Sequence, residues 1–271
     1  ENAIMHAARI GMPLKECTAY ITWPPCTRCA RSLIQAGISN VVYPEKIKIP
    51  ERWAPDFEIS IKAVKDLMKN AKKAGFDAVK FQAFDKNITK NHPESNRLLK
   101  SSISKSNVNK IDKISREIDI EWFCTPMYPD AVNFLEPFVQ RYKIRELDGR
   151  LLLENNSTSL IEKVLDTGKE VFVSSNRSPK HSKLYTNKKI KWLYCVPKYP
   201  CSINDLDFSS IDDFQGYSNH CNDISAVIQA ASCGIEIIEI HVTVDKSKNY
   251  IDNPVSFNFE ECGFAIKKIT K

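Results

Sequence analysis

Glycine is scarce in this chain, which has 8 glycines among its 271 residues, and long apolar runs are absent. No uninterrupted apolar stretch approaches the roughly 20 residues that a membrane-spanning helix needs. No basic and apolar signal peptide opens the sequence. We therefore expect a cytoplasmic protein without a membrane partner. Hydrophobic residues at 42% and charged residues at 27% are typical of a globular protein and exclude disordered and low-complexity classes.

The nine cysteines lack the spacing of a disulfide framework, and their odd number fits a reducing compartment. The net charge of +6 is spread along the chain and forms no basic arm. Because a nucleic-acid-binding surface normally clusters Lys and Arg among aromatic residues, we expect no nucleic-acid partner. The positive balance is compatible with small anionic substrates.

Two unlike segments, 1–57 and 58–271, are predicted to form separate domains. In the first, the apolar spacing predicts a helix, a strand, a helix and a strand, as in a small α/β layer. The second begins with an amphipathic helix at 59–74, after which seven strand-like runs alternate with helical stretches. The runs are 78–82, 121–125, 142–145, 170–175, 190–196, 214–219 and 235–243. This order predicts a parallel sheet with right-handed crossovers, close to a TIM-type (β/α)8 barrel that lacks one strand.

A pair of thiols in the first segment has metal-ligand spacing. Cys26 and Cys29 are one helical turn apart, so both can reach one tetrahedral metal ion. Zinc would need two further ligands. Two ordinary thiols at the start of a helix are the alternative interpretation.

The residues around these thiols resemble the zinc region of cytidine and deoxycytidylate deaminases. The matching stretches are Ala7-Ala-Arg-Ile-Gly11, Tyr20-Ile-Thr22, Pro25-Cys-Thr-Arg-Cys29, Gln35-Ala-Gly-Ile38 and Val41-Val42. The resemblance implies a His-Ala-Glu motif in which His binds zinc and Glu shuttles protons. Aligned on this chain, that motif falls before Glu1. We therefore expect an incomplete zinc site and no deamination by 1–57; a His-Ala-Glu motif upstream would restore the deaminase hypothesis.

Charged and amide side chains recur on one face of the predicted strands of the second segment, because residues two apart in a strand share a face. The pairs are Lys80 with Gln82, Lys143 with Arg145, and Glu239 with His241. Such groups are costly to bury without partners, and near the carboxyl ends of barrel strands they form the usual substrate site. Salt bridges within an inward polar layer are the alternative.

Two histidines lie at neighbouring predicted strands. His220 ends one run and His241 lies in the next. Neighbouring strand ends could bring both imidazoles to one metal ion, with substrate and water completing the shell. Surface or core histidines are the alternative.

From about residue 58 onward the sequence resembles the sialic acid synthase (N-acetylneuraminate synthase) family. The stretches that carry the resemblance include Asp77-Ala-Val-Lys-Phe-Gln82, Phe123-Cys-Thr-Pro126, Val173-Ser-Ser175, Tyr199-Pro200, Gly216-Tyr-Ser-Asn-His220 and Glu239-Ile-His241. The resemblance implies condensation of phosphoenolpyruvate with an N-acylated amino sugar, such as N-acetylmannosamine, to give a nonulosonic acid and phosphate. It also implies a homodimer.

The resemblance further implies a role for each site residue. Lys80 and Lys143 would hold phosphate and carboxylate, and His220 and His241 would hold Mn or Mg. The groups implied to support them are the hydroxyls of Thr125, Ser174 and Ser218, the sugar- or water-orienting Gln82, Tyr199 and Asp252, and Asp148 for proton transfer.

The family's first barrel strand would fall on residues 52–59, which still resemble the deaminase. We therefore expect a barrel with two open edges, for which Lys46-Ile-Lys-Ile49 is the nearest substitute strand. A third, non-enzymatic hypothesis follows, in which a decayed barrel binds a sugar phosphate or a partner without turnover.

Overall fold

The computed structural model of the protein describes residues 2–21, 27–42 and 54–270. Cys26 and the predicted strand 46–49 lie outside the described residues. The chain divides into two compact units, Glu1–Ser60 and Ile61–Lys271. Over the part of the chain that the structure describes, no helix is long and apolar enough to span a bilayer.

The first unit contains two helices and two short parallel strands. They are α1 (Asn2–Arg9), β1 (Thr18–Tyr20), α2 (Thr27–Gln35) and β2 (Asn40–Val42). Helix α2 connects the two strands, as a parallel pair requires, since a tight turn cannot join parallel strands. The order helix, strand, helix, strand is the one predicted from the apolar spacing.

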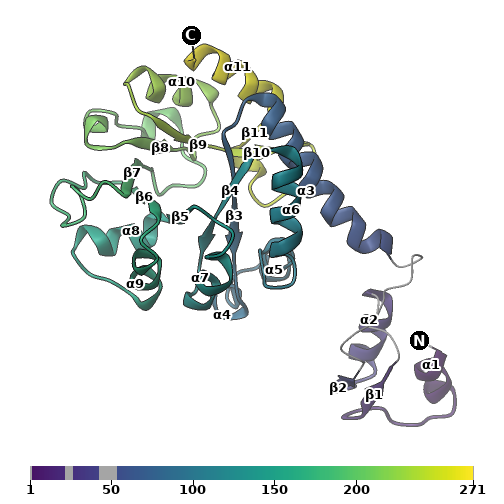
Figure 1. The fold of residues 1–271 in the computed structure, drawn as a ribbon. Helices are drawn as coiled ribbons and strands as arrows, with labels where there is room; N and C mark the ends of the chain where they lie inside the picture. The colour runs from purple at the N-terminus through teal and green to yellow at the C-terminus, as the bar shows by residue number, and fades with distance from the viewer. Residues whose placement is uncertain (1, 22–26, 43–53, 271) are drawn as a thin grey trace. The chain divides into compact units, whose positions relative to one another are not determined.

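A curled sheet of seven parallel strands forms the centre of the second unit (Figure 1). The strands pair strictly in chain order, as successive right-handed crossovers produce. They are β3 (Ala78–Ala83), β4 (Glu121–Pro126), β5 (Arg141–Ile144), β6 (Glu170–Ser175), β7 (Ile190–Tyr194), β8 (Gly216–Ser218) and β9 (Ile237–Glu239). This is the predicted TIM-type barrel architecture with seven strands in its sheet.

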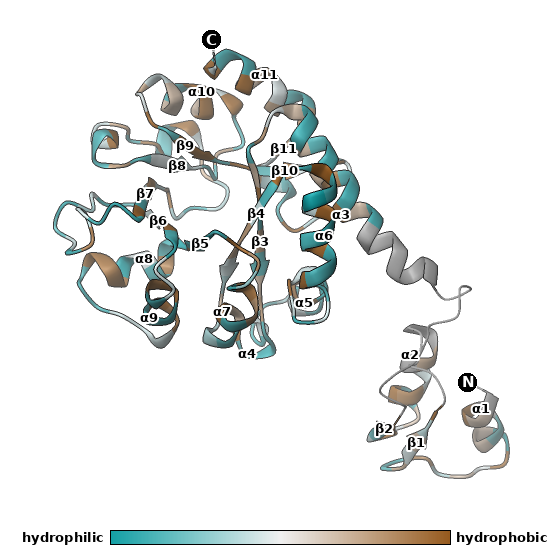
Figure 2. Cartoon of the chain, viewed as in Figure 1, coloured by the Kyte–Doolittle hydropathy of each residue, from teal (hydrophilic) through white to brown (hydrophobic). Residues whose placement is uncertain are grey.

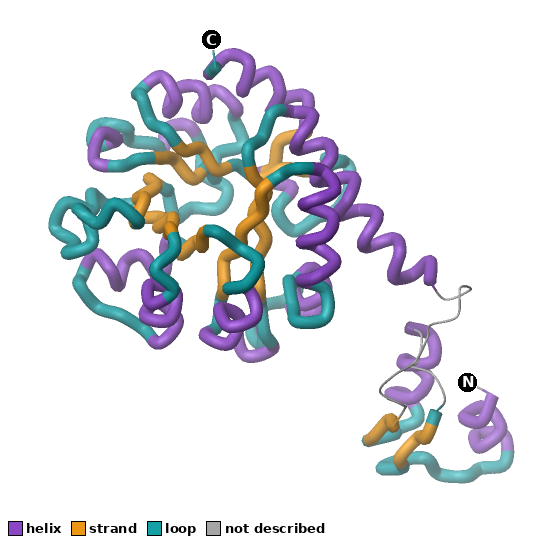
Figure 3. The backbone as a smooth tube through the Cα atoms, viewed as in Figure 1, coloured by secondary structure: helices purple, strands orange, loops and turns teal. Residues whose placement is uncertain are grey.

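Helices surround this sheet, as Figure 3 shows by the purple tubes outside the orange strands. The helices are α3 (Ala54–Ala74), α4 (Lys86–Thr89), α5 (Ser95–Ser101), α6 (Val108–Ile118), α7 (Pro129–Leu135), α8 (Glu146–Leu153), α9 (Ser159–Asp166), α10 (Ile224–Ser232) and α11 (Phe259–Ile269), with short 3-10 turns η2 (Ile203–Asp205), η3 (Ile211–Asp213) and η4 (Asn253–Val255). Helix α3 begins five residues before the predicted 59. Residues 54–59, where the family's first strand would fall, are therefore helical.

Alternation along the strands separates an outer face from an inner one. Outward residues such as Trp122, Tyr142, Trp192 and Tyr217 are at most 3% exposed and pack between the sheet and its helices. The helices turn apolar stripes toward the sheet. Helix α6, for example, carries both hydrophobic (brown) and hydrophilic (teal) residues in Figure 2. Burial of each such aromatic side chain is worth about 1.5–3 kcal/mol. This outer layer therefore holds the strands in place and leaves the inner face for polar groups.

The run 235–243, predicted as one strand, is two strands in different sheets. Ile240 interrupts it, and β10 (His241–Thr243) leaves the large sheet to pair in parallel with β11 (Ser256–Asn258). The prediction of one continuous strand was wrong here. Glu239 therefore ends the last strand of the large sheet, and His241 begins a strand of the two-stranded sheet.

The two edge strands of the seven-stranded sheet are β3 and β9. Most β3 residues and all of β9 are half-buried, whereas β4, β6 and β7 are almost wholly buried. An ion pair between Lys80 of β3 and Glu239 of β9 nevertheless connects the two edges. The sheet is therefore curled far enough for side chains, though not backbone hydrogen bonds, to join its ends.

Candidate active site

The inner face of the sheet has an apolar floor. Phe123 of β4 and Phe172 of β6 meet edge to face with ring centroids 5.5 Å apart. Leu193 packs on them, with Ala78 and Ile237 from the two edge strands at its margin. Phe123 and Phe172 are each the third residue of their strands and Leu193 is the fourth residue of β7, so together they form an apolar layer within the interior. Polar groups follow them toward the carboxyl ends, where barrel enzymes place their sites.

A buried charge cluster lies on this face. Glu239 accepts from the Lys80 ammonium through one carboxylate oxygen, and Nζ of Lys143 lies 2.5 Å from the other. The side chain of Lys143 is only 3% exposed and that of Glu239 13%. In the chain, Glu239 is separated from Lys143 by 96 positions and from Lys80 by 159 positions.

The electrostatics of the cluster are set by burial and by its own charges. Burial alone would raise the pKa of Glu239, but Lys143 and Lys80 hold that pKa well below its usual range. Burial lowers the pKa of Lys143, and the Glu239 carboxylate opposes that shift. Two ammonium groups therefore share one ionised carboxylate. The surplus positive charge suits an anionic ligand.

Hydroxyl groups lie beside the cluster and lack partners. Thr125 and Ser174 are each 2% exposed, and within the described residues neither side-chain oxygen has a hydrogen-bond partner. Thr125 lies in register with Gln82, and Ser174 lies two residues beyond Phe172 on the inner face of β6. Leaving a hydroxyl unpaired in the interior costs about 1–3 kcal/mol. Such orphaned groups indicate a site built for a ligand or for ordered water.

Two imidazoles form the second part of the site. The rings of His220 and His241 have centroids 5.7 Å apart. The ring of Tyr199 meets both edge-on, at 4.9 Å from His220 and 5.8 Å from His241. The Tyr199 hydroxyl donates to Asp252 at 2.6 Å. Burial, and next this hydrogen bond, raise the pKa of Tyr199, so the phenol keeps its proton at neutral pH.

The protonation state of the two imidazoles is the one that a divalent metal ion requires. Burial lowers the pKa of His220, and burial followed by the Lys80 charge lowers that of His241 to about 4. Both rings are therefore neutral at pH 7, the form that binds a metal. Nδ1 of His220 lies 3.0 Å from the Val196 carbonyl oxygen, which leaves Nε2 as the free ring nitrogen. Nδ1 of His241 lies 3.8 Å from Asp252.

The protein supplies few metal ligands of its own. Among the residues that the structure describes, no group of three or more His, Cys, Asp or Glu could hold a metal ion. The two histidines would therefore need oxygen atoms from substrate and water to complete a shell. That requirement agrees with an open, substrate-coordinating site.

Some predicted site residues lie elsewhere. Arg145 does not point with Lys143, because β5 ends at Ile144 and Arg145 precedes α8. Its guanidinium pairs at 2.6 Å with Asp148, the residue predicted for proton transfer. Asp148 is thus held by Arg145 and not by the lysine cluster. Gln82 is half-buried on β3, and Cys29 is half-buried on α2 of the first unit.

Two residues without a predicted role contact the site. Glu239 holds both lysines, although the sequence only placed it on a face with His241. The thiol of Cys195, which is 1% exposed, lies 3.7 Å from Nδ1 of His220. The sequence feature that could have pointed to a role for Glu239 was its charge within an otherwise apolar strand. Nothing in the sequence alone showed which cation it would pair with.

Comparisons with known proteins give two matches. Residues 67–271 match the NeuB family, and residues 1–92 match the MafB19-like deaminases. An uncharacterized protein MJ1065 of Methanocaldococcus jannaschii is 30% identical over 250 residues, which cover 80% of this chain and 72% of that protein. N,N'-diacetyllegionaminic acid synthase of Legionella pneumophila is 27% identical, over 77% of this chain and 67% of that protein.

The structural comparison agrees on the fold. The crystal structure of N-acetylneuraminic acid synthetase from Leptospira borgpetersenii superposes with a TM-score of 0.68 at 24% identity, over 78% of each chain. In the N-terminal part, deoxycytidylate deaminase of Enterobacteria phage T2 is 46% identical over 44 residues, which cover 16% of this chain and 23% of that enzyme. Both resemblances predicted from the sequence are confirmed.

Proposed function

Because the chain belongs to the NeuB family, we propose that its second unit is a nonulosonic acid synthase that condenses phosphoenolpyruvate with an N-acylated amino sugar. The observation that carries this proposal is the buried cluster of Lys80, Lys143 and Glu239 with two unpaired hydroxyls on the same face. Phosphoenolpyruvate presents a phosphate and a carboxylate to such a cluster. Relatives named as synthases of legionaminic and pseudaminic acids support the reaction class.

In this proposal the lysines bind the two anionic groups of phosphoenolpyruvate. Thr125 and Ser174 donate their unpaired hydroxyls to the same anion, and Ser218, also buried, faces the interior from β8. Fixed donors beside the aromatic layer stabilise charge without reorganising. Glu239 keeps both ammonium groups in place until the anion enters.

The imidazole pair would hold the family's divalent metal, Mn or Mg, through His220 and His241. When bound, such an ion supplies Lewis-acid polarisation of an aldehyde oxygen. Tyr199 and Asp252 orient groups beside the imidazoles through their 2.6 Å hydrogen bond. Gln82 would orient the sugar from β3.

The chemistry balances with water as the third reactant. Carbon 3 of phosphoenolpyruvate attacks the aldehyde carbon of the open-chain sugar, which leaves positive charge at carbon 2. Water adds at carbon 2, and phosphate departs to give the keto acid. We assign proton transfer to Asp148, whose carboxylate Arg145 keeps in position.

Phosphate release tests the proposed function. Purified chain with Mn²⁺, phosphoenolpyruvate and N-acetylmannosamine or a related N-acetylhexosamine is expected to release phosphate only when the sugar is present. Lys80→Met should lower the rate about 100-fold or more, because one fixed charge on the anion is lost. Lys110→Met, which removes an exposed lysine of α6, is the matched control. A folded chain without sugar-dependent release would contradict the proposal.

Metal binding provides a second prediction. Replacing both His220 and His241 with alanine should abolish Mn²⁺ binding in isothermal titration calorimetry, since the two neutral imidazoles are the main protein ligands. Replacing the exposed His92 and His181 with alanine is the control and should leave binding unchanged. Equal Mn²⁺ affinity of both double variants would show that the imidazole pair is not the metal site.

We propose no activity for the first unit. Of its predicted thiol pair only Cys29 lies among the described residues, half-buried on α2. Zinc-dependent deamination thus stays the hypothesis drawn from the sequence resemblance.

A further inference from the structure

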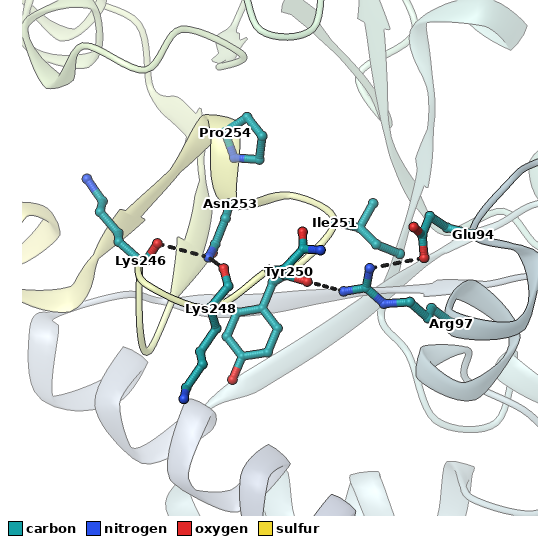
Figure 4. Close-up of a pocket in the computed structure, with 9 residues that line it drawn as sticks. Glu94, Arg97, Lys246, Lys248, Tyr250, Ile251, Asn253 and Pro254 are labelled. Carbon is teal, nitrogen blue, oxygen red and sulfur yellow. Dashed lines mark hydrogen bonds and ion pairs between the residues drawn. The ribbon is translucent and has the colours of Figure 1, made fainter.

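A rim pocket and a pair of thiols both lie outside the proposed reaction. The pocket, of about 430 Å³, lies between the segment that follows β3 and the segment between β10 and β11 (Figure 4). Its guanidinium group, that of Arg97, is paired with Glu94 at 3.0 Å and donates to the Asn249 carbonyl oxygen, so its charge is met within the pocket. The thiols of Cys201 and Cys221, by contrast, are free and buried in one apolar cluster.

Cys201 and Cys221 occupy directly opposite positions on two neighbouring extended segments. They form a parallel β-bridge, beside which the Cys201 N–H donates to the His220 carbonyl oxygen at 3.0 Å. Backbones paired in this way run about 4.8 Å apart, and opposite residues place their side chains on the same side. A disulfide spans Cα separations of about 4.4–6.8 Å. The backbone separation therefore already suits an S–S bond between these two residues.

The two sulfur atoms also share their surroundings. Cys201 is 3% exposed and Cys221 is fully buried, and both pack with Ala226. Burial, and next the neighbouring Cys221, raise the pKa of Cys201 to about 11. The side chains thus meet on the side of the bridge where the backbone places them.

We propose that Cys201 and Cys221 are an oxidative modification site, at which a peroxide converts the two thiols into a disulfide. One sulfur attacks the O–O bond and becomes a sulfenic acid, and the first water leaves. The other sulfur then attacks the sulfenic sulfur, the S–S bond forms, and the hydroxyl group departs as a second water. The two sulfurs lose two electrons in total, and the peroxide accepts them together with the two thiol protons. A small dithiol reverses the reaction by thiol–disulfide exchange.

The chain covers this pair only thinly. Both chain neighbours of Cys201 are exposed, and so is Asn222, which follows Cys221. A peroxide, which is little larger than water, has a short path to the sulfur atoms. Burial disfavours the reactive thiolate form, so we expect the pair to oxidise more slowly than the exposed Cys233.

The disulfide joins the two segments that carry rings of the imidazole site. Tyr199 lies two residues before Cys201, and His220 lies directly before Cys221. The two rings already meet with centroids 4.9 Å apart. A cross-link that closes the loop between the cysteines mainly restricts the unfolded chain. The oxidised second unit should therefore keep these rings together at temperatures at which the reduced unit unfolds, whatever reaction the site performs.

Peptide mapping by mass spectrometry tests the modification. The full chain is incubated with hydrogen peroxide, its remaining thiols are alkylated, and the denatured chain is cleaved at aspartates. Four aspartates between the two cysteines provide the cleavage points: Asp205, Asp207, Asp212 and Asp213. The peptides of Cys201 and Cys221 are expected to stay linked until dithiothreitol is added. Unlinked peptides in a sample whose exposed Cys233 is oxidised, or Cys201 linked to a different cysteine, would overturn the proposal.

Melting temperatures of the oxidised and the reduced chain test the restraint. Oxidation is expected to raise the melting temperature of the second unit by about 5 °C, the scale of a cross-link that closes a loop of about 20 residues. Cys201→Ser and Cys221→Ala should each lose both the linkage and this rise, and each variant is compared with its own reduced form. Cys233→Ser, which removes an exposed thiol at the end of α10, is the matched control and should keep both. A linked chain that melts at the temperature of the reduced chain would disprove the restraint.

Discussion

Replacing Glu239 with glutamine is expected to lower the free energy of unfolding by about 3 kcal/mol, because it leaves two ammonium groups without their shared counter-charge. Lys143 is 3% exposed at its side chain and cannot reach water for compensation. Removing one partner of a buried ion pair typically costs about 3–5 kcal/mol, since the remaining charge stays desolvated. Urea unfolding followed by circular dichroism measures the change.

Two further variants identify the cause of that loss. Glu236→Gln removes an exposed carboxylate just before β9 and should change the unfolding free energy by less than about 0.5 kcal/mol. Adding Lys143→Met to Glu239→Gln should cost less than the sum of the single changes, because it removes the stranded charge. If Glu239→Gln is as stable as Glu236→Gln, Glu239 does not compensate the lysines.

Replacing Gly149 with alanine is expected to destabilise the second unit by about 3 kcal/mol. An added Cβ would lie 2.2 Å from the backbone carbonyl oxygen of Ser174 and 3.1 Å from a methyl group of Val173. Backbone atoms of a central strand cannot move aside, so α8 would have to leave β6. Overpacking of this kind typically costs about 1–3 kcal/mol or more. The shift would also disturb Ser174 and Asp148.

The control is another glycine in a helix. Gly263 lies within α11, and its added Cβ would meet only the Ala74 carbonyl oxygen at 3.8 Å, an ordinary contact. Gly263→Ala should therefore be neutral or stabilise by about 0.5–1 kcal/mol through helix propensity. Thermal unfolding of both variants compares them directly. Equal melting temperatures for Gly149→Ala and Gly263→Ala would disprove the close packing of α8 on β6.

Much of the barrel could be predicted from local patterns. Strands such as β4 and β6 are short apolar runs between amphipathic helices, and a parallel sheet follows from that order alone. The prediction failed where a contact between distant segments of the chain overrode the local pattern. The run 235–243 alternates without a break signal, yet it is divided at Ile240, because His241 pairs with Ser256, a residue outside the large sheet.

For the candidate site, the sequence predicted which types of residue take part better than it predicted which of them contact one another. Lys143 and the histidines were proposed as site residues from charge on apolar strands and from the family resemblance. The pairing of Asp148 with Arg145 followed from the end of β5 at Ile144, one residue before the pattern indicated. Side-chain direction at a strand end depends on where the strand stops, and propensity fixes that boundary poorly.

The sequence by itself determined the periodicity of this protein, and hence the order of its strands and the identity of its charged groups, because period and polarity are local properties. Only the tertiary structure decided which charges meet. Glu239 lies 96 residues from Lys143 and 159 from Lys80 in the chain. Their contact exists because the sheet curls until its first and last strands approach, and curvature is a property of the whole sheet.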